Sequence, residues 1–193
     1  SGRPISDLTG LNLIAGLTSL NLSGTNITTL EKGMLPSGLT SLNLSGCESL
    51  TAIQDGAIAG ITGLKTLDIS NCTALETLYL NDTSKDLAIT MDGTTAVKTL
   101  SLTGTAKTTF DISALTALTH FYGNNSELET LTTAEASAYA AAETFDLSGS
   151  RFDLTAGTAE GDFVRGFAED VAVYNGQRPV IYFAEIPESL KVT

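Results

Sequence analysis

Short segments in which leucines alternate with polar residues recur along the chain. Apolar residues at the fourth and sixth positions of each segment, such as Leu20 and Leu22, flank polar ones. A period of two is typical of a β-strand with one buried face. The segments share one frame and begin at Leu17, Leu39, Leu64, Leu75, Val97 and Leu118. Each segment therefore predicts one strand.

The spacing of these segments predicts stacked coils. Successive starts lie 22, 25, 11, 22 and 21 residues apart, so that four spacings suit one coil and the step of 11 from Leu64 to Leu75 is ambiguous. One such coil cannot enclose its own apolar residues, but stacked coils join them into a continuous core beneath a parallel sheet. We expect regular coils over residues 17–131.

The frame L-x-x-L-x-L-x-x-(T/C/S) is similar to that of leucine-rich repeats. The run ISDLTGLNLIAGLTSLNLSGTNI resembles an internalin-type repeat, whereas LKTLDISNCTALETLYLNDTS and LTHFYGNNSELETL resemble short repeats of secreted bacterial surface proteins. The resemblance covers approximately residues 5–131. It implies a leucine-rich-repeat solenoid with a parallel β-sheet on its concave face and mostly turns and short helical pieces on its convex side. It also implies an extracellular or cell-surface bacterial protein used for attachment, commonly as one module of a longer chain.

The ninth position of the frame, usually Asn or Cys in this family, implies an inward-turned ladder that satisfies backbone groups of the bend. Here the ladder residues are hydroxyls and thiols: Thr25, Cys47, Cys72, Thr83, Thr105 and Ser126. The two cysteines lie in neighbouring coils, about 4.8 Å apart if adjacent strands pair. Buried thiols suit such positions, and a disulfide between them is geometrically conceivable.

Both ends of the array depart from the frame. Residues 1–16 continue the apolar pattern loosely, as an N-terminal capping coil would. Residues 132–193 hold an Ala-rich helix candidate, a degenerate last coil at 145–154 and two β-rich runs around Asn175-Gly176. That turn signal, with Pro179 near an edge, predicts a hairpin. The hairpin either seals the solenoid as a cap or begins another domain.

The charge balance argues against two kinds of partner. With 22 acidic and 10 basic residues, the net charge of -12 repels nucleic acid and anionic membrane surfaces. No apolar run approaches the roughly 20 residues that span a bilayer, so we expect no membrane insertion within this segment. Because the chain starts at Ser1 without an initiator Met, we expect its signal and anchor segments to lie outside it.

Groups suited to catalysis are few. The only histidine, His120, lacks the companions of a zinc motif or a nucleophilic triad, and no phosphate-binding glycine loop is present. A glycosidase needs two placed carboxylates, and nothing in the sequence singles out such a pair. We therefore expect no enzyme activity, no cofactor and no metal.

The third, fifth and seventh positions of each strand face outward if the fourth and sixth face inward. The first strands carry small neutral residues there, whereas the later ones add aromatic rings beside polar groups that suit a protein or glycan partner. The candidate partner-binding residues are Asp68, Tyr79, Asn81, His120, Tyr122 and Asn124. Tyr and Thr are also ordinary strand residues, and the alternative function is a structural spacer within a larger surface protein.

Overall fold

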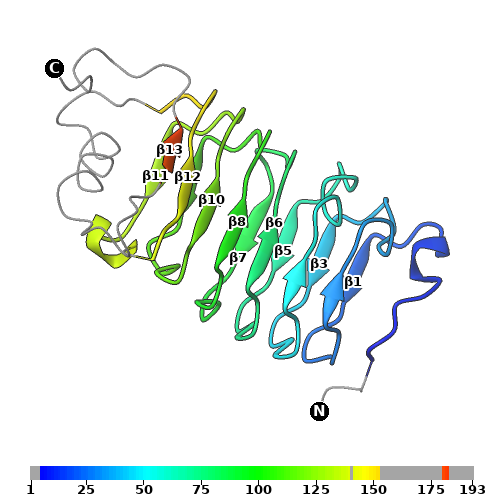
Figure 1. Ribbon diagram of the computed structural model, residues 1–193. Helices are drawn as coiled ribbons and strands as arrows, with labels where there is room; N and C mark the ends of the chain where they lie inside the picture. The colour runs from blue at the N-terminus through cyan, green and yellow to red at the C-terminus, as the bar shows by residue number, and fades with distance from the viewer. Residues whose placement is uncertain (1–4, 140, 153–179, 183–193) are drawn as a thin grey trace, which may run out of the picture.

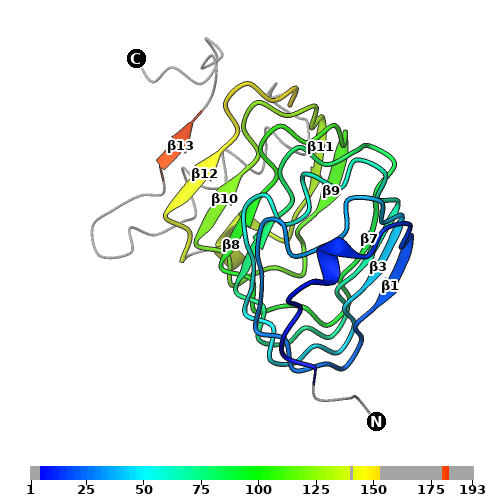
Figure 2. The same ribbon diagram turned by 90° about the vertical axis from the view of Figure 1, so that its right-hand side faces the viewer.

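The chain is wound into a stack of parallel coils (Figure 1). This computed structural model describes residues 5–139, 141–152 and 180–182. Each regular coil carries two short strands on opposite sides of the stack, so strands alternate between two faces along the chain (Figure 2). Every pair of neighbouring strands within the described residues is parallel, which confirms the predicted solenoid.

One side of the stack holds two separate sheets. Sheet A contains β1 (Ser19–Asn21), β3 (Ser41–Asn43), β5 (Thr66–Asp68) and β7 (Ala88–Thr90). Sheet C, further along the same side, pairs β9 (Thr109–Asp111) with β11 (Thr130–Thr132). Between sheets A and C the pairing of neighbouring strands is interrupted.

Sheet B covers the opposite side without interruption. In sequence order it contains β2 (Thr29–Leu30), β4 (Ala52–Ile53), β6 (Thr77–Tyr79), β8 (Thr99–Ser101), β10 (His120–Tyr122), β12 (Thr144–Asp146) and β13 (Val180–Tyr182). The sequence led us to expect turns and short helical pieces on the side opposite the first sheet. The described residues hold only two short 3-10 helices, η1 (Leu11–Leu13) and η2 (Ala136–Tyr139).

The second sheet explains the ambiguous step of 11 residues. Segments starting at Leu17, Leu39 and Leu64 form strands of sheet A, whereas that starting at Leu75 forms β6 of sheet B. A step of 11 residues is half a coil, because each coil crosses both sides of the stack. The six segments therefore do not form one sheet: three lie on each side.

The core lies between the two sides and consists mainly of inward-facing leucines and isoleucines. In sheet A, Leu42 and Leu67 stack in register and are each 1% exposed. In sheet B, Leu78 and Leu100 do the same and are fully buried. Burying each such side chain contributes about 1.5–3 kcal/mol, and a coil gains this only when its neighbours cover it.

Several strands end with a local polar contact. The side-chain oxygen of Asn43 or Asp68 accepts the backbone N–H two residues further on, at distances of 2.8 and 2.9 Å. The residue directly after that N–H donor takes a left-handed conformation, as at Gly46 (φ 67°) and Asn71 (φ 55°). Glycine and asparagine suit this conformation best, which explains the S-G and S-N pairs that follow the strands.

Two polar ladders line the bends that follow these strands, one on each side of the stack. After sheet A, the Sγ atoms of Cys47 and Cys72 donate to Leu22 O and Leu44 O at 3.1 and 3.2 Å. Both cysteines are buried free thiols. Thr94, which the sequence frame missed, continues this ladder by donating to Ile69 O at 2.6 Å.

After sheet B the ladder consists of hydroxyls. Thr83 Oγ1 donates to Leu80 O at 2.8 Å and lies 2.9 Å from Thr105 Oγ1. Ser126 Oγ donates to Gly123 O, and one coil later Ser150 Oγ donates to Leu147 O at 2.6 Å. Thr83, Thr105 and Ser126 are at most 5% exposed, so the side chains that the sequence assigned to one ladder belong to two.

The ends of the stack differ. At the N-terminal end Leu8 and Leu11 pack against the core, but Leu13 and Ile14 are 80% and 50% exposed. At the other end, β12 pairs with β10, and β13 pairs with β12 in parallel. Most of the predicted hairpin around Asn175-Gly176 lies outside the described residues.

Candidate binding site

Five of the six candidate binding residues lie on sheet B. Tyr79 and Asn81 come from β6 and the bend after it, and the other three from β10 and its bend. Asp68 ends β5 in sheet A, on the opposite side of the stack. Our grouping of Asp68 with the aromatic residues was therefore wrong, because the half-coil after Leu64 carries the chain from one sheet to the other.

The two tyrosines occupy equivalent positions two strands apart. In the ladder, Tyr79 pairs with Ser101 and Ser101 with Tyr122. Because neighbouring strands are about 4.8 Å apart, the Cα atoms of the tyrosines are separated by roughly 10 Å. Ser101 points outward yet is only 2% exposed, while both tyrosines are half-buried. The rings thus flank a covered serine in the middle of the sheet.

A line of side-chain hydrogen bonds crosses the same face. Asn81 Nδ2 donates to Asp55 Oδ1 at 2.9 Å, and Ser101 Oγ donates to Asn81 Oδ1 at 2.6 Å. In the bend after β8, Thr103 Oγ1 donates to Asn124 Oδ1 at 2.8 Å. These contacts hold the polar side chains in place, so less conformational entropy is lost when a partner orders them further.

His120 is held by three neighbours. Its ring stacks on Tyr122 with centroids 6.3 Å apart and planes at 25°. Its Nδ1 lies 2.9 Å from Thr119 Oγ1, and its Nε2 lies 3.5 Å from a carboxylate oxygen of Glu143. Such contacts fix the orientation of the histidine and tyrosine rings and form one edge of the aromatic surface. We call Tyr79, Asn81, Ser101, His120, Tyr122 and Asn124 the sheet B surface.

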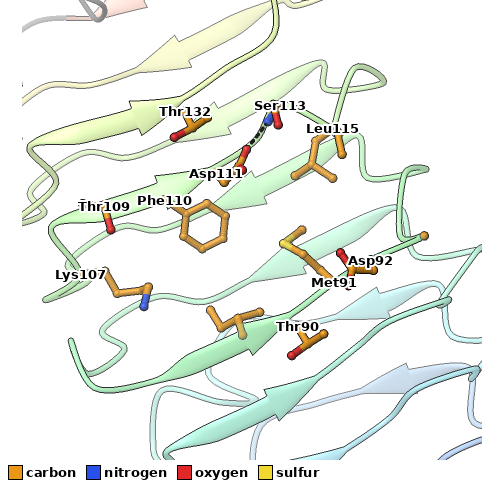
Figure 3. Close-up of a pocket in the computed structure, with 13 residues that line it drawn as sticks. Thr90, Met91, Asp92, Lys107, Thr109, Phe110, Asp111, Ser113, Leu115 and Thr132 are labelled. Carbon is orange, nitrogen blue, oxygen red and sulfur yellow. Dashed lines mark hydrogen bonds between the residues drawn. The ribbon is translucent and has the colours of Figure 1, made fainter.

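The structure shows a second feature, a cleft between β7 and β9, that sequence reasoning missed. It has a volume of about 490 Å³ and lies where sheet A stops and sheet C begins (Figure 3). Lys107 borders the cleft, and burial lowers the pKa of its ammonium group. One sequence signal marks the place: Leu115 occupies the ninth position of its coil, where the preceding coil has Thr94.

Two further features bear on the chemistry available. Within the part of the chain that the structure describes, no group of three or more His, Cys, Asp or Glu side chains is arranged to hold a metal ion. No helix among those residues is long and apolar enough to cross a membrane.

Comparison with known proteins agrees with the fold. The family model of the leucine-rich-repeat domain of the endo-β-N-acetylglucosaminidase EndoS matches residues 1–84. No curated protein matches the chain. The repeat frame, the parallel coils and this family match define a leucine-rich-repeat solenoid, a fold that commonly serves as a protein-binding module.

Three of the solved structures to which the chain is similar come from two bacteria and a plant. The functional domain of InlJ from Listeria monocytogenes, which includes a cysteine ladder, is 21% identical (TM-score 0.31; 79% of this chain, 38% of that one). A leucine-rich-repeat protein of Leptospira interrogans is 15% identical (0.31; 80% and 47%). The ectodomain of a membrane receptor kinase from Arabidopsis thaliana is 20% identical (0.29; 74% and 25%). The chain spans less than half of each protein's length.

Proposed function

We propose that this protein is a non-enzymatic extracellular binding module, adhesin-like in its role, that contacts a protein or glycan through the sheet B surface. The observation that supports this most is the pair of half-buried tyrosines on either side of Ser101, with His120 stacked beside Tyr122. Sheet B is unbroken through the described residues, so these rings stand on a rigid support.

Aromatic rings with polar edges suit recognition for a physical reason. Tyrosine buries a large apolar area at the cost of only two side-chain torsions, and its hydroxyl can still bind water or a partner. The sheet B surface places such rings beside the amides of Asn81 and Asn124, which Ser101 and Thr103 hold in position. This combination of a stacking surface and fixed hydrogen-bonding groups supports contact with a protein loop or with sugar rings.

The charge of the chain narrows the choice of partner. A net charge of -12 opposes nucleic acids and anionic membranes and leaves neutral glycans and proteins as candidates. The extracellular location rests on the resemblance of the repeats to bacterial surface repeats and on the bacterial origin of two of the similar structures.

A glycan and protein array probed with the whole chain tests this function. For a ligand found there, we expect the Tyr79→Ala/Tyr122→Ala variant to stay folded and to bind at least about tenfold more weakly, as for central aromatic anchors. The matched control is Ser19→Ala/Thr66→Ala, which changes two exposed outward positions of sheet A and should leave the affinity unchanged.

Two other results would contradict this proposal. If the tyrosine variant bound as tightly as the unmodified chain, the sheet B surface would not be the contact surface. If no array ligand bound at all, the protein would fit better as a structural spacer that projects another domain. The small, neutral outward residues of β1 and β3 would suit that role.

A further inference from the structure

The interruption between β7 and β9 leaves two strand edges facing each other. On sheet A, β7 pairs with β5, and on sheet C, β9 pairs with β11. No backbone hydrogen bond joins β7 to β9 among the described residues. On the other side of the same coils, β6, β8 and β10 pair without a gap. The coils thus remain stacked through sheet B, while β7 and β9 on the other side are not paired.

The direction of the backbone groups follows from the existing pairs. Ala88 N–H donates to Lys65 O, and Thr90 O accepts from Ile69 N–H, so these residues face β5. Successive residues of a strand direct their backbone groups to opposite sides. The N–H groups of Ile89 and Met91 therefore face the cleft.

The same argument holds for the other edge. Ile112 N–H donates to Thr132 O and Thr108 O accepts from Thr130 N–H, so both residues face β11. The C=O groups of Thr109 and Asp111 consequently face the cleft from the opposite side. The cleft is lined by hydrogen-bonding groups of two strand edges that run in the same direction.

Apolar side chains form the floor of the cleft. Ile89 and Met91 are half-buried, although Leu67 and Ile69 at the same positions one coil earlier are at most 1% exposed. Phe110 from β9 lies between the two strands (Figure 3). A cover is therefore missing over side chains that a regular coil would bury.

One side chain already satisfies part of this edge. The ammonium group of Lys107 donates to Leu87 O at 2.7 Å. In the preceding coil the equivalent carbonyl, Lys65 O, accepts a strand N–H from Ala88 at 2.8 Å. The ammonium group of Lys107 thus takes the place of one backbone N–H from a neighbouring strand. The other backbone groups on this edge of β7 receive no backbone hydrogen bond from β9.

We propose that this cleft binds an extended peptide segment of a partner protein, which adds a strand between β7 and β9. Strand addition gives affinity through main-chain hydrogen bonds and specificity through alternate side chains. Apolar side chains of the peptide cover Ile89 and Met91, beside the buried ring of Phe110. Its outward side chains are Lys or Arg, because the exposed carboxylates of Asp92 and Asp111 border the cleft. This surface is separate from the sheet B surface.

A fluorescein-labelled peptide of alternating Lys and Val residues, seven residues long, is the probe. We expect its anisotropy to rise on titration with the whole chain. Two control peptides should bind at least about tenfold more weakly: one with Glu in place of Lys, and one N-methylated at alternate residues. Equal binding of the N-methylated peptide, or no binding of the Lys-Val peptide at millimolar concentration, would overturn the proposal.

Variants of the chain test whether the peptide binds in the cleft. Asp92→Asn/Asp111→Asn should weaken binding several-fold, and the asparagine at 111 keeps the oxygen that accepts Ser113 N–H at 2.8 Å. The control Glu31→Gln/Glu48→Gln removes the same charge at two exposed positions in earlier coils and should have no such effect. Equal weakening by both pairs would mean a general charge effect and would contradict a peptide held in the cleft.

Discussion

The hydroxyl of Tyr139 links the 3-10 helix η2 to the coil that borders the cleft. Tyr139 is fully buried, its Oη donates to Ile112 O at 2.8 Å and accepts Ala134 N–H at 3.2 Å. Leu115 follows at the ninth position and has no hydroxyl to satisfy this carbonyl. Burial also raises the pKa of the phenol, so it stays protonated and able to donate.

The substitution Tyr139→Phe isolates the hydroxyl, because the ring keeps its edge-on contact with Phe145, with centroids 5.8 Å apart. Ile112 O retains its bond from Leu115 N–H, whereas Ala134 N–H loses the phenol oxygen. One net hydrogen bond is worth about 0.5–1.5 kcal/mol, and a buried group without a partner costs about 1–3 kcal/mol. We therefore expect a loss of about 1–2 kcal/mol.

Urea unfolding followed by circular dichroism measures this loss, with Tyr79→Phe as the matched control on the half-buried sheet B surface. Since coils of a solenoid can unfold separately, amide exchange at Ala134 gives a local second reading. The control should change stability by less than about 0.5 kcal/mol. Equal stability of the two variants, with unchanged exchange at Ala134, would refute the role of this hydroxyl.

Three further perturbations test the interior. Burial raises the pKa of the Cys72 thiol to about 11, so Ellman's reagent at pH 8 should react with it only after unfolding. In the unfolded chain the thiol has a pKa near 9. The free energy of unfolding should therefore stay constant up to about pH 9 and then decrease by up to roughly 3 kcal/mol as the pH rises towards 11. An equally steep decrease in a Cys72→Thr variant would contradict this. Thr105→Val should cost about 1–2 kcal/mol, and a double-mutant cycle with Thr83 should show coupling, since their hydroxyls are 2.9 Å apart. Leu100→Ala should destabilise by about 2–5 kcal/mol in urea titrations, because Leu100 is fully buried; a loss under 1 kcal/mol would argue against a continuous core.

The repeat frame predicted strands where residues alternate clearly. All six segments contain a strand, and each strand begins two residues after the segment does, as Ser19 follows Leu17. The intervening strands were missed for a local reason. β2 and β4 have only two residues, and the first position of the β7 segment is Asp86 instead of an apolar residue. β2 and β4 therefore offer too few alternating positions to show a period of two, whereas the β7 segment keeps Ile89 and Met91 at the fourth and sixth positions and lacks only the apolar first one.

The candidate site was predictable only within one sheet. Outward positions on β6 and β10 follow from alternation alone, and these residues share the sheet B surface. Which side of the stack Asp68 lies on depends on the sheet to which its strand belongs. The step of 11 residues in the sequence does not show which sheet that is. Leu115 at the ninth position marks the place of the cleft, but its opening depends on whether two strands that are 21 residues apart, at Ala88 and Thr109, come close enough to pair, and the sequence does not show that.

The most direct measurement of the binding function is a map of the contact surface on the isotope-labelled chain. With a ligand from the array, backbone amide shifts recorded by NMR should change at β6, β8 and β10, above all near Tyr79, Ser101 and Tyr122. Amides of β1, β3 and β5 on the opposite side should stay unchanged. Shifts confined to sheet A would contradict the proposed surface, even if the affinity were high.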